Sequence, residues 1–215
     1  MAIALVTSSY GSQNTAAVDT TGADLLWLGY HTGGEAQTFA DSKSNSWTSL
    51  AYPFDNSVPA NLRTAYSLPT SVGSGHTCGP APVFYQDVMM AAFSGVEQTS
   101  PLDAEAEASA GSAVTSHAAG SVTPSVNGCL IICELQLTVD WVGFTPPAGF
   151  THETGTRIAW LVQATAATVN PSWSWTNAQR ALAKIAVFKP AAGGGGGAGL
   201  AMPPRRAFPL QILNH

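Results

Sequence analysis

Short runs rich in β-branched and aromatic residues dominate the sequence from residue 2 to residue 189, separated by clusters of Gly, Pro, Asn, Asp and Ser. These runs predict β-strands joined by turns, because β-branched and aromatic side chains favour extended backbone and the intervening residue types favour turns. Helical periodicity is nearly absent, and only 178–185 contains residues that also favour a helix. The predicted strands are 2–7, 15–19, 24–30, 46–51, 62–68, 83–93, 120–123, 129–139, 157–164, 172–175 and 181–189.

This pattern predicts an all-β fold, a jelly-roll-like β-sandwich, because strands at such spacing bury their apolar faces by packing two sheets together. The two halves of the chain also resemble each other: 18–26 resembles 122–131 in placing a turn between two strands, 66–70 resembles 160–165, and 90–93 resembles 185–188. Two related sets of strands packed face to face explain these likenesses. Unrelated strands of similar composition explain them equally well, and both interpretations stay open.

Residues 100–109 alternate small and acidic side chains, with acids at Asp103, Glu105 and Glu107. Such alternation is typical of an exposed edge strand, where charges keep the open edge from pairing with other chains. We interpret these acids as a solvated face rather than as a carboxylate site.

Cys78, Cys129 and Cys133 make an odd count, which argues against a complete set of disulfides. Cys129 and Cys133 share one face of a predicted strand but lie roughly 13 Å apart at the usual rise per residue. That separation is too large for a bridge, so we expect buried free thiols.

Composition argues against several classes of partner. Only 10% of the residues are charged and the net charge is −5, so the chain offers no basic field for nucleic acid. Residues 1–6 carry no positive charge before their short apolar run and do not read as a signal peptide. No segment has the length of a transmembrane helix. We expect no nucleic-acid partner, no membrane insertion and synthesis in a cytoplasm.

The sequence contains no motif typical of an enzyme or of a cofactor site. A Gly-x-Ser-x-Gly elbow, a phosphate-binding loop, a dinucleotide fingerprint and a His-Glu-x-x-His helix do not occur. The five histidines are scattered, so no metal site is predicted. Residues 41–45 place oxygen-bearing side chains at alternate positions, but Lys43 stands where a cation would sit; a turn with Asx hydrogen bonds is the better interpretation. We expect neither catalysis nor a cofactor.

Trp47, Trp173 and Trp175 are the candidate glycan-binding residues, since aromatic rings stack on sugars. Trp173 and Trp175 share one face of a predicted strand, about 7 Å apart. This spacing suits either a glycan platform or a core, and we favour the core. Trp47 follows a polar turn and is the other exposed candidate.

The C-terminal segment differs from the rest of the chain. The unbroken glycine run 193–197 has no side chains to bury and is typical of a tether. The residues after it are apolar and basic, and prolines among them discourage a helix, so we expect them to bind a neighbouring subunit by strand addition or in a groove. The predicted partner-binding residues are Met202, Arg205, Arg206, Phe208, Leu210, Ile212 and Leu213. The expected organisation is a β-sandwich domain over 1–190, a Gly-rich linker over 191–199 and an extended C-terminal docking arm over 200–215.

Residues 14–189 resemble a widespread and mostly uncharacterised β-sandwich domain found in phage structural proteins and in large bacterial surface proteins. The pieces that carry the resemblance are 21–26, 41–48, 73–77, 92–96, 99–103 and 185–188. The resemblance implies a jelly-roll-like fold with an accessory role in adhesion, decoration or carbohydrate binding, and it brings no catalytic residues. The chain differs from that family in lacking a secretion signal and in having one domain and a tail, and both differences favour a virion component.

Two functions follow as expectations. The first is a phage virion structural protein that decorates the capsid, collar or tail and is made in the host cytoplasm. Its partners would be other virion proteins, and it would form a homo-oligomer. The alternative is a carbohydrate- or receptor-binding module of a virion or cell surface, with a cell-surface glycan stacked on the tryptophans.

Overall fold

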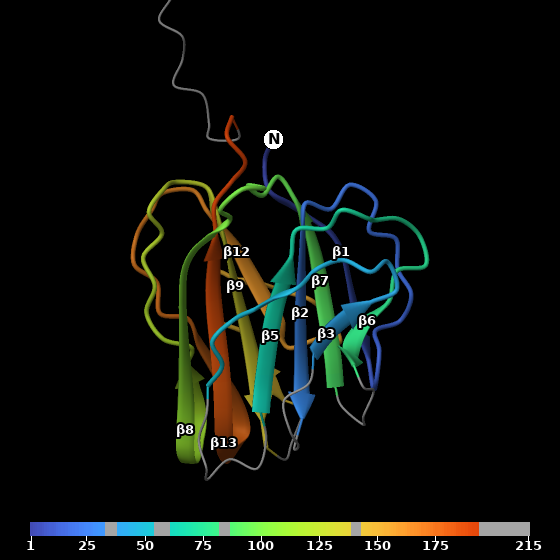
Figure 1. The fold of residues 1–215 in the computed structure, drawn as a ribbon. Helices are drawn as coiled ribbons and strands as arrows, with labels where there is room; N and C mark the ends of the chain where they lie inside the picture. The colour runs from blue at the N-terminus through green and yellow to red at the C-terminus, as the bar shows by residue number, and fades with distance from the viewer. Residues whose placement is uncertain (33–37, 54–60, 82–86, 139–142, 194–215) are drawn as a thin grey trace, which may run out of the picture.

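The computed structural model describes residues 1–32, 38–53, 61–81, 87–138 and 143–193. Within these ranges the chain is all-β, a β-sandwich, as the strand pattern predicts (Figure 1). The strands are β1 (Ala4–Gly11), β2 (Leu25–Thr32), β3 (Thr38–Asp41), β4 (Thr48–Ser49), β5 (Asn61–Ser67), β6 (Cys78–Ala81), β7 (Asp87–Ser94), β8 (Leu102–Ala118), β9 (Cys129–Leu137), β10 (Phe144–Thr145), β11 (Thr151–His152), β12 (Ile158–Gln163) and β13 (Ser172–Phe188).

Each half of the chain builds one sheet of the sandwich. The first half forms a five-stranded sheet in the order β1-β7-β2-β5-β4. The second half forms a six-stranded sheet in which β8 pairs with β13, and the order continues through β9, β12 and β11, with β10 also on β13. Every pairing is antiparallel, and the small two-stranded sheet β3–β6 lies beside the first sheet (Figure 1).

The two sheets repeat one topology. In each sheet the first strand of the half lies next to the last, followed by the second strand, and the order β1-β7-β2-β5-β4 matches β8-β13-β9-β12-β11. The register agrees as well, since Leu25 lies opposite Phe93 and Leu130 lies opposite Phe188. These are the segments that resemble each other in the sequence. The two halves are therefore equivalent in topology, as the interpretation with two related sets of strands requires.

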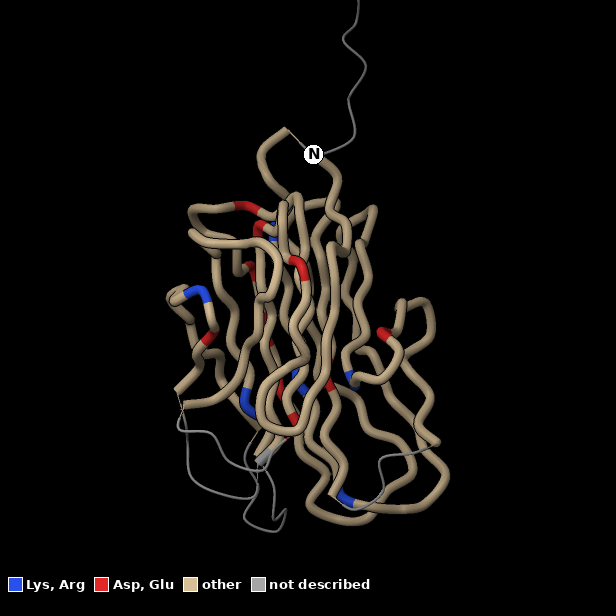
Figure 2. The backbone as a smooth tube through the Cα atoms, turned by 90° about the vertical axis from the view of Figure 1, so that its right-hand side faces the viewer, with Lys and Arg blue, Asp and Glu red and all other residues tan. Residues whose placement is uncertain are grey.

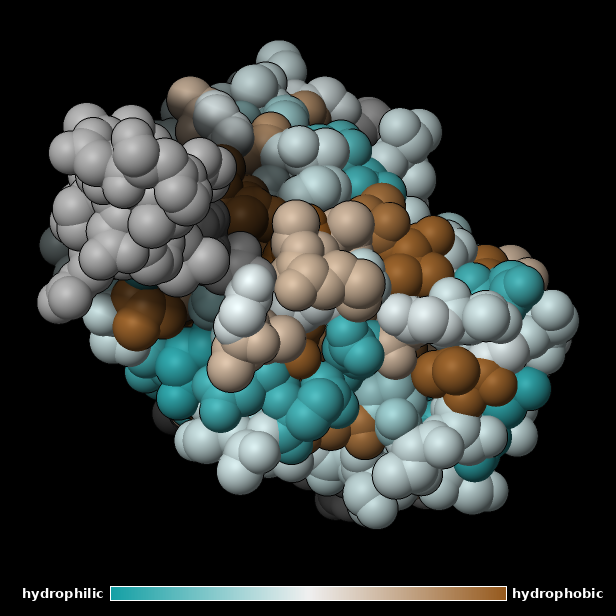
Figure 3. Space-filling model, turned by 90° about the horizontal axis from the view of Figure 1, so that it is seen from above, coloured by the Kyte–Doolittle hydropathy of each residue, from teal (hydrophilic) through white to brown (hydrophobic). Residues whose placement is uncertain are grey.

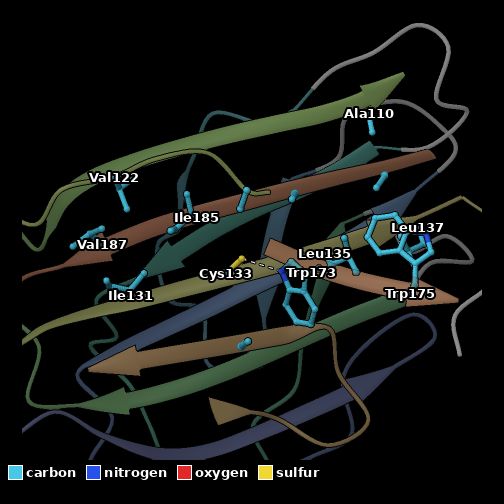
Figure 4. Packing of buried hydrophobic residues seen from close by; sticks show 14 of the residues in the cluster. Ala110, Val122, Ile131, Cys133, Leu135, Leu137, Trp173, Trp175, Ile185 and Val187 are labelled. Atoms are coloured by element: carbon cyan, nitrogen blue, oxygen red, sulfur yellow. Dashed lines mark hydrogen bonds between the residues drawn. The ribbon is translucent and has the colours of Figure 1, made fainter. Parts of the chain in front are cut away.

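Three large apolar clusters lie in successive layers of the molecule, beside a small buried pair of Leu62 and Leu182. The central cluster lies between the sheets and joins residues such as Trp27 and Phe93 of the first sheet to Ile132 and Phe188 of the second. A second cluster covers the outer face of the first sheet and includes the partly buried Phe39. The third covers the outer face of the second sheet (Figure 4). Each sheet is thus covered on both faces, which accounts for nearly continuous apolar strands such as β9.

The structure corrects several element boundaries. Predicted strands 15–19 and 120–123 contribute only the isolated bridges Val18–His76 and Val122–Val169, and the short strands β3, β6, β10 and β11 were not predicted. Segments 172–175 and 181–189 belong to one strand, β13, whose pairing with β8 shifts register between Ser174 and Ala181. The ambiguous 178–185 is extended within β13, with Ala181, Ala183 and Ile185 in the outer cluster and Leu182 packed on Leu62 of the first sheet.

Candidate functional site

A chain of hydrogen-bonded polar side chains crosses the layer between the two sheets. It begins at Glu134 on β9, which is fully buried. Glu134 Oε2 accepts a hydrogen bond from Trp27 Nε1 on β2 at 2.7 Å, and His31 Nε2, also on β2, lies 3.2 Å from Glu134 Oε1. These contacts join the two sheets directly, because β2 and β9 belong to opposite sheets.

Arg157, which precedes β12, extends this chain towards the surface. Its guanidinium contacts His31 Nδ1 and donates to Asp87 Oδ2 at 3.0 Å. Asp87 in turn accepts a hydrogen bond from the hydroxyl of the exposed Tyr10 at 2.6 Å. Because a guanidinium can only donate, His31 Nδ1 is the acceptor and Nε2 carries the proton that faces Glu134.

Burial sets the protonation of the two central groups. It raises the pKa of Glu134 to about 8, although the Trp27 hydrogen bond and the charge of Arg157 oppose the shift. Burial, together with the charge of Arg157, also holds the pKa of His31 well below its ordinary value. Burial thus favours the neutral form of both groups, whereas the hydrogen bonds that the two Glu134 oxygens accept favour its carboxylate.

Gly29 makes room for the Glu134 carboxyl group. A Cβ atom at position 29 would lie 2.0 Å from Oε1 and 2.2 Å from Oε2 of Glu134. In the repeated topology the two positions are equivalent: Gly29 lies opposite Met89 on β7, and Glu134 lies opposite Lys184 on β13. One member of this facing pair is a glycine, so the other can be a long polar residue.

Lys184 forms a second buried charged group beside this chain. Its ammonium is fully buried and donates to Glu105 Oε2 at 2.5 Å and to Glu107 Oε2 at 3.1 Å on β8. The prediction of an edge strand is confirmed, because β8 pairs within the described residues only with β13. Glu105 and Glu107 are exposed, as the interpretation of a solvated face requires, and both also neutralise the buried ammonium of Lys184. Figure 2 shows that charged positions are sparse along the backbone.

A buried polar cluster around the Asp41 side chain joins residues of 41–48 to Thr20 and His76. Asp41 accepts hydrogen bonds from Lys43 N at 2.7 Å and Trp47 Nε1 at 2.8 Å, and His76 Nε2 lies 3.3 Å from Asp41 Oδ1. His76 Nδ1 lies 2.8 Å from Thr20 Oγ1. The bond to Lys43 N confirms the predicted Asx turn.

This series of acid, imidazole and hydroxyl has the order of groups found in nucleophilic catalysis. His76 and Thr20 are both fully buried, however, and Thr20 Oγ1 also accepts a hydrogen bond from Gly73 N at 3.1 Å. The cluster joins three segments that are far apart in the sequence. These contacts therefore hold the three segments together in the fold.

The predicted tryptophan pair fills the core. Trp173 is fully buried and Trp175 is 6% exposed, so neither ring offers a face for stacking on a glycan. Both lie in the cluster over the outer face of the second sheet, where Trp173 Nε1 donates to Cys133 Sγ at 3.0 Å (Figure 4). Trp47 is half-buried, with its ring centroid 6.3 Å from that of Phe39.

The cysteines are free and buried, as predicted. Burial raises the pKa of Cys133 to about 12, so this thiol stays protonated near neutral pH. Within the described ranges, no group of three or more His, Cys, Asp or Glu side chains is placed to hold a metal ion. The same part of the chain contains no helix long and apolar enough to cross a membrane.

Residues 189–191, which follow β13, are fixed to one end of the sandwich, beside the N-terminus (Figure 1). Pro190 forms a bridge with Val96, and Ala191 N donates to the carbonyl of Gly95 at 2.8 Å. Gly95 is held by Asp24, whose Oδ2 accepts from Gly95 N at 2.5 Å. The predicted partner-binding residues Met202, Arg205, Arg206, Phe208, Leu210, Ile212 and Leu213 lie outside the described residues.

Comparisons with protein-family models, curated proteins and solved structures found no match.

Proposed function

We propose that this protein is a phage virion structural protein that attaches to neighbouring subunits through its C-terminal arm. The observation that carries the proposal is that the chain is hydrogen-bonded to the sandwich immediately before the Gly-rich linker. Residues 189–191 are bonded to residues 95–97, with Glu97 N donating to the carbonyl of Lys189 at 3.0 Å. A partner bound by the arm would therefore be connected to the sandwich at residues 189–191.

The surface around residues 189–191 also suits a contact with another protein. Met1 is 68% exposed and Val126 is 43% exposed. A Cβ atom on the nearby Gly128 would lie 3.8 Å from Pro190, which places the turn containing Val126 beside the departing chain. Figure 3 views this end of the molecule and shows apolar side chains among polar ones on its described part. Apolar surface next to a tether favours association with another protein.

The arm supplies the second part of the contact. Its apolar residues suit strand addition or a groove on a neighbour, and Arg205 and Arg206 suit pairing with acids there. A body and an arm that bind the same particle benefit from effective concentration, since either contact holds the other close to its site.

The proposal is tested by adding the purified protein to particles of the encoding virus that were assembled without it. Full-length protein is expected to sediment with the particles. A matched control keeps the arm at full length but replaces Phe208, Leu210, Ile212 and Leu213 with serine, and we expect this variant to stay in the supernatant. Equal sedimentation of both proteins would refute attachment through the arm, and no sedimentation of either would refute the virion role.

A further inference from the structure

β1 and β8 are the equivalent edge strands of the two sheets, and they differ in charge. Among the described residues each pairs with a single strand, β1 with β7 and β8 with β13. In the repeated topology Ser8 and Tyr10 of β1 stand in the register positions that Glu105 and Glu107 hold on β8. Charges such as these two acids, which are bonded to the buried Lys184, keep an edge from adding a further strand. β1 has neither a charged residue nor a proline, so it lacks this protection.

The outer edge of β1 is open over most of its length. Only its last part is covered, where the Tyr10 carbonyl accepts a hydrogen bond from Ala16 N at 3.2 Å. Over residues 4–9 the described part of the chain supplies no backbone partner other than β7. Leu5 packs against the central cluster and Val6 against the cluster over the outer face of the first sheet, and both are only partly buried. A strand added here would extend both apolar layers and bond the open backbone groups.

The C-terminal arm has the sequence of such a strand. Phe208, Leu210 and Ile212 are apolar at alternate positions, with Pro209 and Gln211 between them. Alternation with this period places the three apolar side chains on one face of a strand. Pro209 has no N–H to donate, so it suits a position whose backbone faces away from the sheet. The backbone groups of the three apolar residues then face the sheet.

The place where the chain leaves the sandwich favours a neighbouring copy as the acceptor. Ala191 N donates to the carbonyl of Gly95, and a Cβ atom on Gly95 would lie 2.5 Å from the carbonyl oxygen of Ala2, so the arm starts beside the beginning of β1. An arm that folded back on its own β1 would run parallel to it. On a neighbouring copy the arm can run antiparallel, as every pair of strands in this sandwich does. Antiparallel pairing is also the more stable per residue.

An acid beside β1 matches the charge of the arm. Glu153 accepts hydrogen bonds from Ser8 Oγ at 2.9 Å and from Trp160 Nε1 at 2.8 Å. Within the described ranges it forms no ion pair. Arg205 and Arg206 precede the alternating segment of the arm. A guanidinium from the arm would supply the cation that Glu153 lacks.

We propose that the outer edge of β1 binds residues 207–213 of a neighbouring copy of this chain as an added antiparallel strand. The inference rests on the proposed attachment through the arm and names the partner, a second copy of the same protein. It also accounts for the difference between the equivalent edges, because the acids of β8 keep that edge free while β1 accepts a strand.

Hydrogen exchange of the full-length protein at several protein concentrations tests the proposal. The amides of residues 4–9 that do not bond to β7 are expected to exchange about ten-fold more slowly at about ten times the dissociation constant of self-association than in dilute protein. The amides of β8 are expected to show no such change.

Proline substitutions in the arm provide a matched pair. Leu210→Pro removes an N–H that faces β1, whereas Gln211→Pro removes one that faces away. We expect Leu210→Pro to abolish the protection of β1 and Gln211→Pro to keep it. Leu210→Ala, which keeps the N–H, controls for loss of the leucine side chain and is expected to weaken the protection less than Leu210→Pro.

Protection of β8 in place of β1, or equal effects of the two proline variants, would overturn the proposal. Protection that does not depend on protein concentration would overturn it as well, because the arm would then bind its own β1. If virus particles bind the full-length protein through the arm while β1 stays unprotected, this inference fails and the proposed function stands. If β1 is protected and the particles bind no protein, the virion role fails and this inference stands.

Discussion

Replacing Gly29 with alanine tests whether the sheets are fitted around the Glu134 carboxyl group. The new Cβ would lie 2.0 Å from Oε1 and 2.3 Å from Cδ of Glu134, well inside van der Waals contact. The backbone of Gly29 does not have a positive φ, so the substitution brings no backbone strain. Its whole cost is the displacement of a buried, hydrogen-bonded carboxyl group, which we expect to be about 2–3 kcal/mol.

The size of this effect should depend on Glu134. Glu134→Ala alone removes the acceptor of the Trp27 and His31 hydrogen bonds and is expected to cost about 2–4 kcal/mol. In the double variant the alanine at position 29 occupies space that the carboxyl group has vacated. We therefore expect the double variant to lose about 2 kcal/mol less than the sum of the single losses.

Urea unfolding followed by tryptophan fluorescence measures these free energies. Combining Gly29→Ala with Glu97→Ala is the control, because the hydrogen bond and ion pair of Glu97 are both with Lys189 and not with Gly29 or Glu134. Those two effects should add within about 0.5 kcal/mol. Additivity of the Gly29 and Glu134 effects would refute the steric account.

Three further predictions concern stability and one concerns the arm. Trp173→Ala should lower the free energy of unfolding, measured with urea, by about 3–5 kcal/mol because it opens a cavity in the outer cluster. Trp47→Phe should lower it by only about 1 kcal/mol, because this variant loses the hydrogen bond to Asp41. Asp41→Ala should lose about 2–4 kcal/mol, since buried donors lose their acceptor; a smaller loss would show that the cluster does not hold the fold. Folding lowers the pKa of His31, so below pH 6.5 the unfolded chain binds a proton at His31 that the folded chain does not bind. The free energy of unfolding should therefore fall as pH drops below 6.5. His31→Gln should reduce that fall. In pull-downs, the chain ending at Gly193 should fold but not bind particles.

The repeated strand pattern made the fold accessible from sequence. Alternating β-branched residues and turn residues identified most long strands, and the likeness of 90–93 to 185–188 anticipated two equivalent sets of strands. The short strands β3 and β10 were not predicted, because strands of two to four residues carry too little periodicity to be recognised in the sequence. The register shift that makes β13 continuous depends on pairing with β8, which local sequence does not encode.

The polar layer could not be predicted. Glu134 stands in an apolar run, and its partners Trp27, His31 and Arg157 come from segments distant in the sequence, so only the packing of the sheets brings them together. A single signal was available: a glutamate within a strand that is otherwise apolar needs a buried partner. At Asp41 the local Asx turn could be predicted from the sequence, whereas the contact with His76, which is distant in the sequence, could not.

The amount of this protein in purified virus particles tests the central claim most directly. Mass spectrometry would compare particles produced with the full-length chain and with the chain ending at Gly193, alongside the soluble amount of each protein. We expect the full-length chain in the particles, and the shortened chain folded and soluble but absent from them. Equal incorporation of the two chains would contradict attachment through the arm.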